Sequence, residues 1–251
     1  MAENRKEAED RVEGKNAVME ALKAGRPLDK IYIARGEQDK TIRFIVQKAK
    51  AAGAVVSEVD RRKLDAMSVT HAHQGVIAVA AVREYSTVAD ILALAAQRGE
   101  APLVVVCDEI SDPHNLGAII RTAECAGAHG VIIPKHRSAG ITAVVEKTSA
   151  GAVEHMAVAR VVNLAAALKE LQDAGVWVFG TAADGEKNLW EADLKSPTAL
   201  VIGSEGSGMS RLTRESCDFL LSIPLRGKVS SLNASNAAAI VLFEAVRQRL
   251  G

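Results

Sequence analysis

Aromatic residues are scarce in this chain, at 3% of 251 residues, although hydrophobic residues of all kinds make up 48%. The core must therefore be built mainly from alanine, valine, leucine and isoleucine, in one large domain or two modest ones. The scarcity also argues against a surface on which nucleic-acid bases stack, because stacking needs aromatic faces.

An excess of either charge is also missing, since 31 basic residues balance 31 acidic ones. The distribution is uneven: residues 14–83 carry 13 basic and 7 acidic side chains, whereas residues 99–251 carry 14 and 17. A moderately basic front part could bind phosphate. On charge alone, however, a solvated surface with scattered lysines is the simpler interpretation.

Paired cysteines and long apolar runs are absent from the sequence as well. Cys107, Cys125 and Cys217 lie far apart without a CxxC spacing, which fits a reducing compartment and argues against a zinc cluster. The six histidines are scattered along the chain. We therefore expect no metal, no membrane span and a cytoplasmic location, with a flexible N-terminus over residues 1–11.

The front part alternates short helical and strand-like segments, punctuated by glycine. The pattern predicts helices over 16–24, 41–52 and 60–67, and strands over 30–34, 54–59 and 75–82. We interpret 12–82 as a small α/β domain. The apolar pattern breaks at Arg83, so residues 83–98 are interpreted as a linker and a connecting helix over 88–97.

The rear part, 99–251, continues the alternation. It predicts strands over 103–107, 131–134, 176–181, 199–203 and 220–224, and helices over 115–126, 164–174 and 233–250. Strands that alternate with helices form a mostly parallel sheet covered on both faces, so the fold class is α/β. Such sheets bind ligands at the carboxyl ends of their strands.

The first candidate motif, 108–121, follows the strand at 103–107. Asn115 begins the next helix, where we expect it to act as the N-cap, and Gly117 permits close packing. Arg121 lies on an otherwise apolar helix, so it could be a surface cation. A phosphate partner is the more informative alternative, because a guanidinium grips phosphate with two parallel bonds.

The second candidate motif is GSEGSG, 203–208, after another strand. Its spacing is neither the dinucleotide pattern GxGxxG nor the phosphate loop GxxxxGK[ST]. Glu205 in the middle would repel a pyrophosphate, but it could hold a cation such as Arg121 or a sulfonium ligand. A turn with an exposed acid is the plain alternative.

The third candidate motif, 230–236, is rich in serine and asparagine. Capping the final helix needs one of these residues, which leaves Ser231 and Asn233 available to bind a ribose or a substrate hydroxyl. A hydrolase triad is unsupported, because His114 and the other histidines lie far away in sequence.

Together the three motifs resemble the SpoU (TrmH) branch of the SPOUT RNA ribose 2′-O-methyltransferases, over 103–251. The residues that carry the resemblance are Asn115, Gly117, Arg121, Gly203, Glu205, Gly206, Gly208, Ile223, Pro224, Gly227, Ser231, Leu232 and Asn233. The stretch from Val12 to Val18 is similar to the start of the family's ribosomal-protein-like RNA-binding domain. The two-domain form is most similar to the RlmB-type branch, which methylates a guanosine of large-subunit ribosomal RNA.

The resemblance implies a C-terminal SPOUT domain, 99–251, with a deep trefoil knot, a rare exception to the rule against threading. It implies that S-adenosylmethionine binds in that knot, held near Thr181, Gly203, Ile223 and Leu232. It also implies a homodimer whose site is completed across the interface.

The resemblance further assigns Arg121 to the ribose hydroxyl, with Asn115, Glu205, Ser231 and Asn233 shaping the pocket. A guanidinium has a pKa above about 12, so we prefer Arg121 as a cation that binds the target phosphate rather than as the base.

Other functions stay open at this point. A Rossmann-type dehydrogenase would need a glycine-rich turn after 103–107, which the sequence lacks. A non-catalytic RNA-binding protein would leave the rear motifs without a purpose. Within the family, transfer RNA is the chief alternative substrate.

Overall fold

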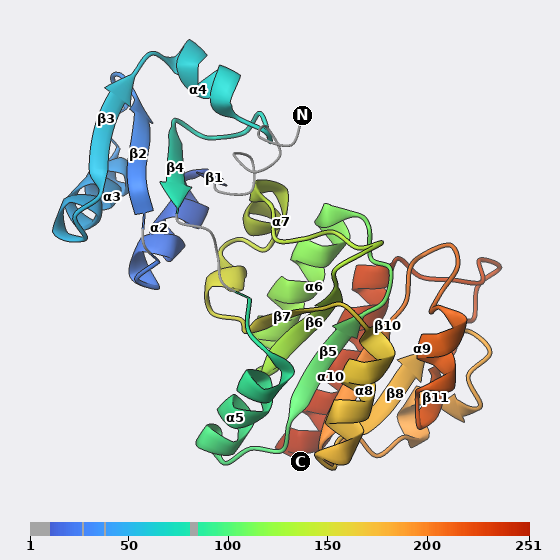
Figure 1. Cartoon of the computed structure of the whole chain (residues 1–251). Coiled ribbons are helices and arrows are strands. Elements are labelled where there is room, and N and C mark those ends of the chain that lie inside the picture. The colour runs from blue at the N-terminus through green and yellow to red at the C-terminus, as the bar shows by residue number, and fades with distance from the viewer. Residues whose placement is uncertain (1–10, 27, 38, 81–84) are drawn as a thin grey trace. The chain divides into compact units, whose positions relative to one another are not determined.

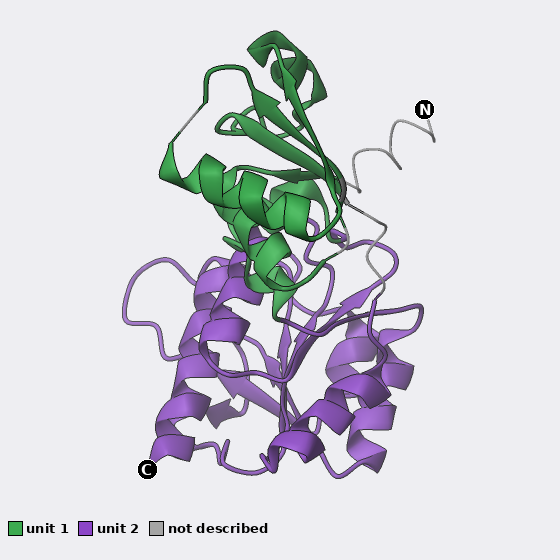
Figure 2. Ribbon diagram, turned by 90° about the vertical axis from the view of Figure 1, so that its left-hand side faces the viewer, with its two compact units in different colours: residues 1–84, 141–155 green, residues 85–140, 156–251 purple. Residues whose placement is uncertain are grey.

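The computed structural model of the chain describes residues 11–26, 28–37, 39–80 and 85–251. It divides into two compact units (Figure 2). Unit 1 comprises residues 1–84 together with 141–155, and unit 2 comprises residues 85–140 together with 156–251. The predicted flexible terminus, except for Arg11, and the first two linker residues lie outside the described residues. The domain limits predicted from sequence remain a prediction.

Unit 1 is built on a four-stranded sheet in the order β1-β4-β2-β3. The strands are β1 (Arg11–Glu13), β2 (Leu28–Ala34), β3 (Val55–Val59) and β4 (Val76–Ala80). β2 and β3 are parallel, whereas β4 runs antiparallel to both of its neighbours. The sheet of this unit is therefore mixed.

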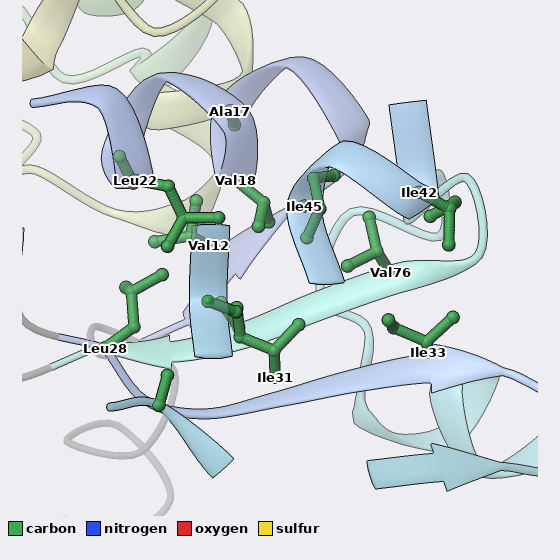
Figure 3. Close-up of a cluster of buried hydrophobic side chains, with 14 residues drawn as sticks. Val12, Ala17, Val18, Leu22, Leu28, Ile31, Ile33, Ile42, Ile45 and Val76 are labelled. Carbon is green, nitrogen blue, oxygen red and sulfur yellow. The ribbon is translucent and has the colours of Figure 1, made fainter. Parts of the chain in front are cut away.

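Two helices, α2 (Lys15–Lys23) and α3 (Lys40–Ala51), supply the main core of unit 1. Figure 3 shows Val18 and Ile45 from these helices lying over Ile31 of β2 and Val76 of β4. A smaller cluster joins the helix α4 (Arg61–Met67) to the sheet through Leu64. The helix predicted over 60–67 is thus observed, and Asp60 caps its start by accepting a bond from the Arg62 amide.

The second chain segment of unit 1 contains α7 (Ala143–Thr148) and the short 3₁₀ helix η1 (Ala152–Glu154). It supplies two buried carboxylates to Arg26, whose Nη1 donates to Glu146 Oε1 at 2.5 Å and to Glu154 Oε1 at 3.0 Å. These carboxylates raise the pKa of Arg26 against the opposing effect of burial. This ion-pair cluster therefore joins the two chain segments of unit 1, whose paired residues lie more than a hundred positions apart.

Glu13 has a structural role in the stretch from Val12 to Val18, which resembles the start of the family's RNA-binding domain. Its side chain is fully buried, and it accepts bonds from Ser68 Oγ at 2.6 Å and from the amides of Val69 and Thr70 at 2.7 and 3.2 Å. Burial alone would raise the pKa of Glu13, but these hydrogen bonds outweigh it and lower the pKa. Gly14 follows with φ of +96°, a conformation that glycine adopts without strain.

Unit 2 contains a seven-stranded sheet in the order β7-β6-β5-β10-β8-β11-β9, in which every neighbouring pair is parallel. The strands are β5 (Leu103–Cys107), β6 (Gly130–Pro134), β7 (Val158–Val161), β8 (Trp177–Thr181), β9 (Lys187–Asn188), β10 (Thr198–Ile202) and β11 (Phe219–Ser222). The predicted α/β class and the parallel sheet are confirmed.

Helices cover both faces of this sheet (Figure 1), with α6 and α10 on one face and α5 and α8 on the other. The helices of unit 2 are α5 (Val88–Arg98), α6 (Pro113–Cys125), α8 (Leu164–Asp173), α9 (Arg211–Glu215) and α10 (Ala234–Leu250), with the 3₁₀ helix η2 (Leu189–Glu191). β5 is buried along its whole length, as its continuous apolar run predicted. No described helix is long and apolar enough to cross a membrane.

Candidate active site

Three neighbouring parallel strands, β10, β8 and β11, end at the same edge of the sheet in unit 2. The segments that follow them surround a cavity of about 440 Å³, which we call the strand-end cavity. Thr181, Gly203, Ile223 and Leu232 all line it. The four residues that the resemblance assigned to the cofactor are thus brought to one place, and their roles stay predictions.

The loop after β10 forms one wall of the strand-end cavity and folds tightly on itself. The amides and carbonyls of Ser204 and Gly208 exchange two 3.0 Å hydrogen bonds. A Cβ atom at Gly203 would lie 2.4 Å from the backbone of Gly208 and Met209, so only glycine fits there. The buried Asp108 secures the end of the loop by accepting a 2.7 Å bond from the Ser210 amide.

Three polar side chains from separate elements meet beside this loop. Asn115 Nδ2, from α6, donates to Glu205 Oε1 at 2.9 Å. Asn233 Nδ2, from the start of α10, donates to Asn115 Oδ1 at 3.0 Å and also to Glu205. We call these three residues the Asn–Glu–Asn network. Both side-chain amides donate to the same carboxylate, and these bonds fix the position of that carboxylate.

The predicted N-cap at Asn115 is wrong. Asp112 caps α6 by accepting a 2.8 Å bond from the His114 amide, and Pro113 occupies the first helical position. Proline presets the helical φ and needs no amide partner there, so the helix begins two residues earlier than predicted. Asn115 is freed for the network. The last helix is capped by Asn233, one of the two residues left for a ribose in the sequence analysis, whose Oδ1 accepts from the Ser235 amide at 3.0 Å.

Arg121 and Ser231 occupy different positions relative to this network. Ser231 is exposed and lines the strand-end cavity. Arg121 is exposed on α6, six residues after Asn115, and is not among the described residues that line either this cavity or the one beside it. The fold of the single chain therefore does not bring Arg121 to either cavity.

The sequence analysis missed a charged pair in the same cavity wall. Arg214 of α9 binds Asp184 with two bonds, Nη1 to Oδ1 at 2.9 Å and Nη2 to Oδ2 at 3.0 Å. The Arg214 bond lowers the pKa of Asp184, so the pair stays charged at neutral pH. No motif signals this pair, because Asp184 and Arg214 lie 30 residues apart on unrelated segments.

A second cavity, also about 440 Å³, lies on the other side of the loop, and we call it the side cavity. Residues 204–207 and Ala234 line both cavities. Asn115, Glu109 and Arg137 line the side cavity alone. Glu205 therefore stands in the wall between two neighbouring compartments, one of which meets the carboxyl end of β5.

Neither cysteine near this region is suited to nucleophilic chemistry. Burial raises the pKa of Cys107 and of Cys217 to about 12, so both are protonated thiols at neutral pH. Within the described ranges, no three histidine, cysteine or acidic side chains lie close enough together to hold a metal ion.

The strand-end cavity fits S-adenosylmethionine in size and lining. Its volume lies within the range of about 300–1,000 Å³ that is typical of small-molecule sites. Ile223, Leu225 and Leu232 supply apolar surface for an adenine, and the strand ends supply main-chain groups for the ribose. The Glu205 carboxylate provides a negative charge in the same wall, as a cationic sulfonium requires.

Comparison with known proteins agrees with this geometry. Residues 102–243 match the SpoU rRNA Methylase family, and residues 11–86 match an RNA 2′-O ribose methyltransferase substrate-binding family. The chain is 48% identical over 224 residues, 89% of both chains, to the 23S rRNA (guanosine-2′-O-)-methyltransferase RlmB of Ralstonia nicotianae. It is 45% identical over 249 residues to an uncharacterized tRNA/rRNA methyltransferase of Mycobacterium ulcerans, which covers 99% of this chain and 80% of the relative.

Solved structures extend the agreement to the fold. The crystal structure of an AdoMet-bound rRNA methyltransferase from Sinorhizobium meliloti superposes with a TM-score of 0.82 at 28% identity, over 100% of this chain and 92% of that one. The motif residues, the parallel sheet and both sequence matches lead to the same conclusion. The chain belongs to the SpoU rRNA methylase family and is an RNA methyltransferase whose cofactor is S-adenosylmethionine.

Proposed function

We propose that this protein methylates the ribose 2′-hydroxyl of a guanosine in large-subunit ribosomal RNA. The observation that carries the proposal is the Asn–Glu–Asn network in the wall between the strand-end cavity and the side cavity. The name of the Ralstonia nicotianae relative supports ribosomal RNA and guanosine as the target.

The chemistry needs alignment more than it needs a strong acid or base. When bound, the cofactor supplies a methyl group made electrophilic by its sulfonium. Thr181, Gly203, Ile223 and Leu232 would hold the cofactor, and the loop at 204–207 borders both this cavity and the side cavity. Correct alignment of two reactants contributes about 7–11 kcal/mol in well-oriented systems.

The Asn–Glu–Asn network keeps this loop in one position. The carboxylate of Glu205 accepts bonds from both Asn115 and Asn233, so it cannot rotate away from the wall without breaking both bonds. Ser231, which lines the strand-end cavity, supplies a hydroxyl toward the substrate ribose. The proton of the ribose hydroxyl passes to the substrate phosphate, because both carboxylates that line the strand-end cavity are engaged, Glu205 with two asparagines and Asp184 with Arg214.

In this proposal, Arg121 of one protomer acts at the active site of a second protomer. Its side chain is exposed on α6, and it lines neither cavity of its own chain among the described residues. α10 packs beside α6 and carries the exposed Phe243, as a homodimer contact requires. In the dimer, the Arg121 guanidinium binds the target phosphate and stabilises the developing alkoxide.

Family membership supports two further features of the proposal. The chain threads a trefoil knot near the strand-end cavity, and the protein acts in the cytoplasm. The unpaired cysteines are in keeping with a reducing compartment.

The test is methyl transfer from labelled cofactor to large-subunit ribosomal RNA and to bulk transfer RNA, followed by mapping of the modified nucleotide. We expect label in the ribosomal RNA, at the 2′-oxygen of one guanosine. Label in transfer RNA alone would replace the proposed substrate by the second candidate, since the name of the Mycobacterium ulcerans relative includes both kinds of RNA.

A further inference from the structure

The side cavity has one cationic side chain among the described residues that line it. That residue is Arg137, in the segment after β6, and its guanidinium is 83% exposed. Its partner is Glu109, in the segment after β5, whose Oε1 lies 3.2 Å from Arg137 Nη1. The pair therefore connects the ends of two neighbouring parallel strands at the edge where ligands bind.

The backbone at both ends of this pair is held in an unusual conformation. Glu109 has φ of +56° and Arg137 has φ of +58°, a region that residues other than glycine rarely adopt. The two segments are also bonded to each other, since Ile110 O accepts from Ser138 Oγ at 3.1 Å and from the Ala139 amide at 2.8 Å. The structure thus holds the two side chains opposite one another.

Stability does not explain this arrangement. An ion pair this exposed adds little to folding, while each left-handed residue costs folding free energy. Strained residues of this kind concentrate at ligand sites, where geometry matters more than stability. The side cavity that the pair borders shares the Glu205 wall with the strand-end cavity.

We propose that the side cavity receives the sugar–phosphate backbone of the substrate RNA and that Arg137 binds a phosphate next to the target ribose. This inference rests on the proposed RNA-methylating function. A guanidinium matches a phosphate with two parallel bonds, and every ribose in RNA is flanked by phosphates. Glu109 is the counter-ion that holds Arg137 in place until the phosphate displaces it.

The experiment measures the dissociation constant of an RNA that the wild-type protein methylates, across a series of salt concentrations. Arg137→Gln should weaken binding about tenfold at low salt and reduce the slope of log affinity against log salt by about 0.7–0.9, one phosphate contact. The affinity for S-adenosylmethionine, measured by calorimetry, should stay at the wild-type value.

Glu109→Gln should have the opposite effect. It removes the carboxylate that competes with the phosphate, so RNA should bind severalfold more tightly at low salt. The matched control is Arg211→Gln, because Arg211 is 79% exposed and is paired with Glu215 at 2.9 Å, outside both cavities. This control should leave the affinity and the salt slope unchanged.

Two results would overturn the inference. One is a salt slope for Arg137→Gln equal to that of the wild type. The other is a loss of RNA affinity for Arg211→Gln as large as that for Arg137→Gln, which would mean that any surface cation attracts RNA equally. Failure of the proposed function is a separate result. The binding experiment does not depend on methyl transfer. If label appears only in transfer RNA, the proposed ribosomal substrate is wrong. The salt dependence of binding, measured with that transfer RNA, still tests the role of Arg137. Where no RNA is methylated, a large-subunit ribosomal RNA fragment serves as the probe.

Discussion

The side-chain amide of Asn115 donates a 2.9 Å hydrogen bond to the carboxylate of Glu205, 90 residues further along the chain. The bond joins the helix after β5 to the loop after β10, and these two strands are neighbours in the sheet. Because Asn233 donates to the same carboxylate, Glu205 joins this loop to the start of α10 as well as to α6.

Replacing Glu205 with glutamine should therefore slow methyl transfer more than it weakens cofactor binding. Both asparagines donate to Oε1, which glutamine keeps, but the substitution removes the charge that strengthens both bonds and so loosens the loop. We expect a 10- to 100-fold lower single-turnover rate, from roughly 1.5–3 kcal/mol for a charged hydrogen bond. Glu215→Gln, on α9, is the control. A large loss of S-adenosylmethionine affinity with an unchanged rate would contradict this role.

Alanine at Gly203 should abolish cofactor binding, whereas alanine at Gly206 in the same loop should not. A Cβ at Gly203 would meet the backbone of Gly208 and Met209 at 2.4 Å, so the loop must move. At Gly206 a Cβ meets no described atom within 4 Å. Calorimetric titration with S-adenosylmethionine compares the two variants, and equal affinities would show that loop geometry does not control the site.

A mixing experiment tests whether Arg121 serves the partner's site. Arg121→Ala and Glu205→Ala should each be nearly inactive as pure proteins. After subunit exchange, half of the dimers are mixed and each has one intact site, so activity should recover to about a quarter of the wild-type value. No recovery, despite mixed dimers detected by native mass spectrometry, would place both residues in the site of one chain.

Truncating Arg26 to alanine should destabilise unit 1 by about 3–5 kcal/mol, because it removes a buried guanidinium that is bonded to both Glu146 and Glu154. Adding Glu146→Gln to Arg26→Ala removes one of the two charges and should restore part of the loss. Urea unfolding of the three proteins measures both effects. Equal stability of Arg26→Ala and the wild type would mean that water or another group compensates these charges.

Substituting Glu13 with glutamine should destabilise the protein by about 1–3 kcal/mol at pH 7, because the buried carboxylate accepts bonds from Ser68, Val69 and Thr70. Hydrogen bonding lowers the pKa of Glu13 from 4.5 in the folded state. Its stabilising contribution is therefore complete above pH 4.5 and is lost as the pH falls further. Thermal unfolding at pH 7 and pH 3 should show the difference between the two proteins narrowing, and a constant difference would contradict this origin.

Sequence patterns were sufficient to predict the longer helices, in which apolar residues recur regularly, and the continuous apolar strand β5. β5 was predicted with its observed limits, and α2, α3, α8 and α10 were predicted within one or two residues. The short elements α7, β7 and α9 were missed, because four to six residues carry too little periodicity to distinguish them from loops. The N-cap of α6 was misplaced, since Asn115 and Asp112 are both good caps and Pro113 decides between them.

The cavity-lining glycines and the polar motif residues were also identified in advance, because they belong to three sequence motifs that each follow a predicted strand. The Asp184–Arg214 pair and the Glu109–Arg137 pair were not. Each joins two segments that only the strand order β6-β5-β10-β8-β11 brings together, and no local sequence pattern specifies that order.

Because residues 141–155 belong to unit 1, this unit cannot be completed while only its first 84 residues have emerged from the ribosome. At about 5–20 residues per second, several seconds of translation separate Arg26 from its two carboxylates. During that interval the nascent N-terminal sheet has a cation without its partners and lacks the helix α7. A stall or premature stop before residue 141 should therefore yield a fragment that chaperones and proteases recognise as unfinished, even though its strands β1–β4 have all been synthesised.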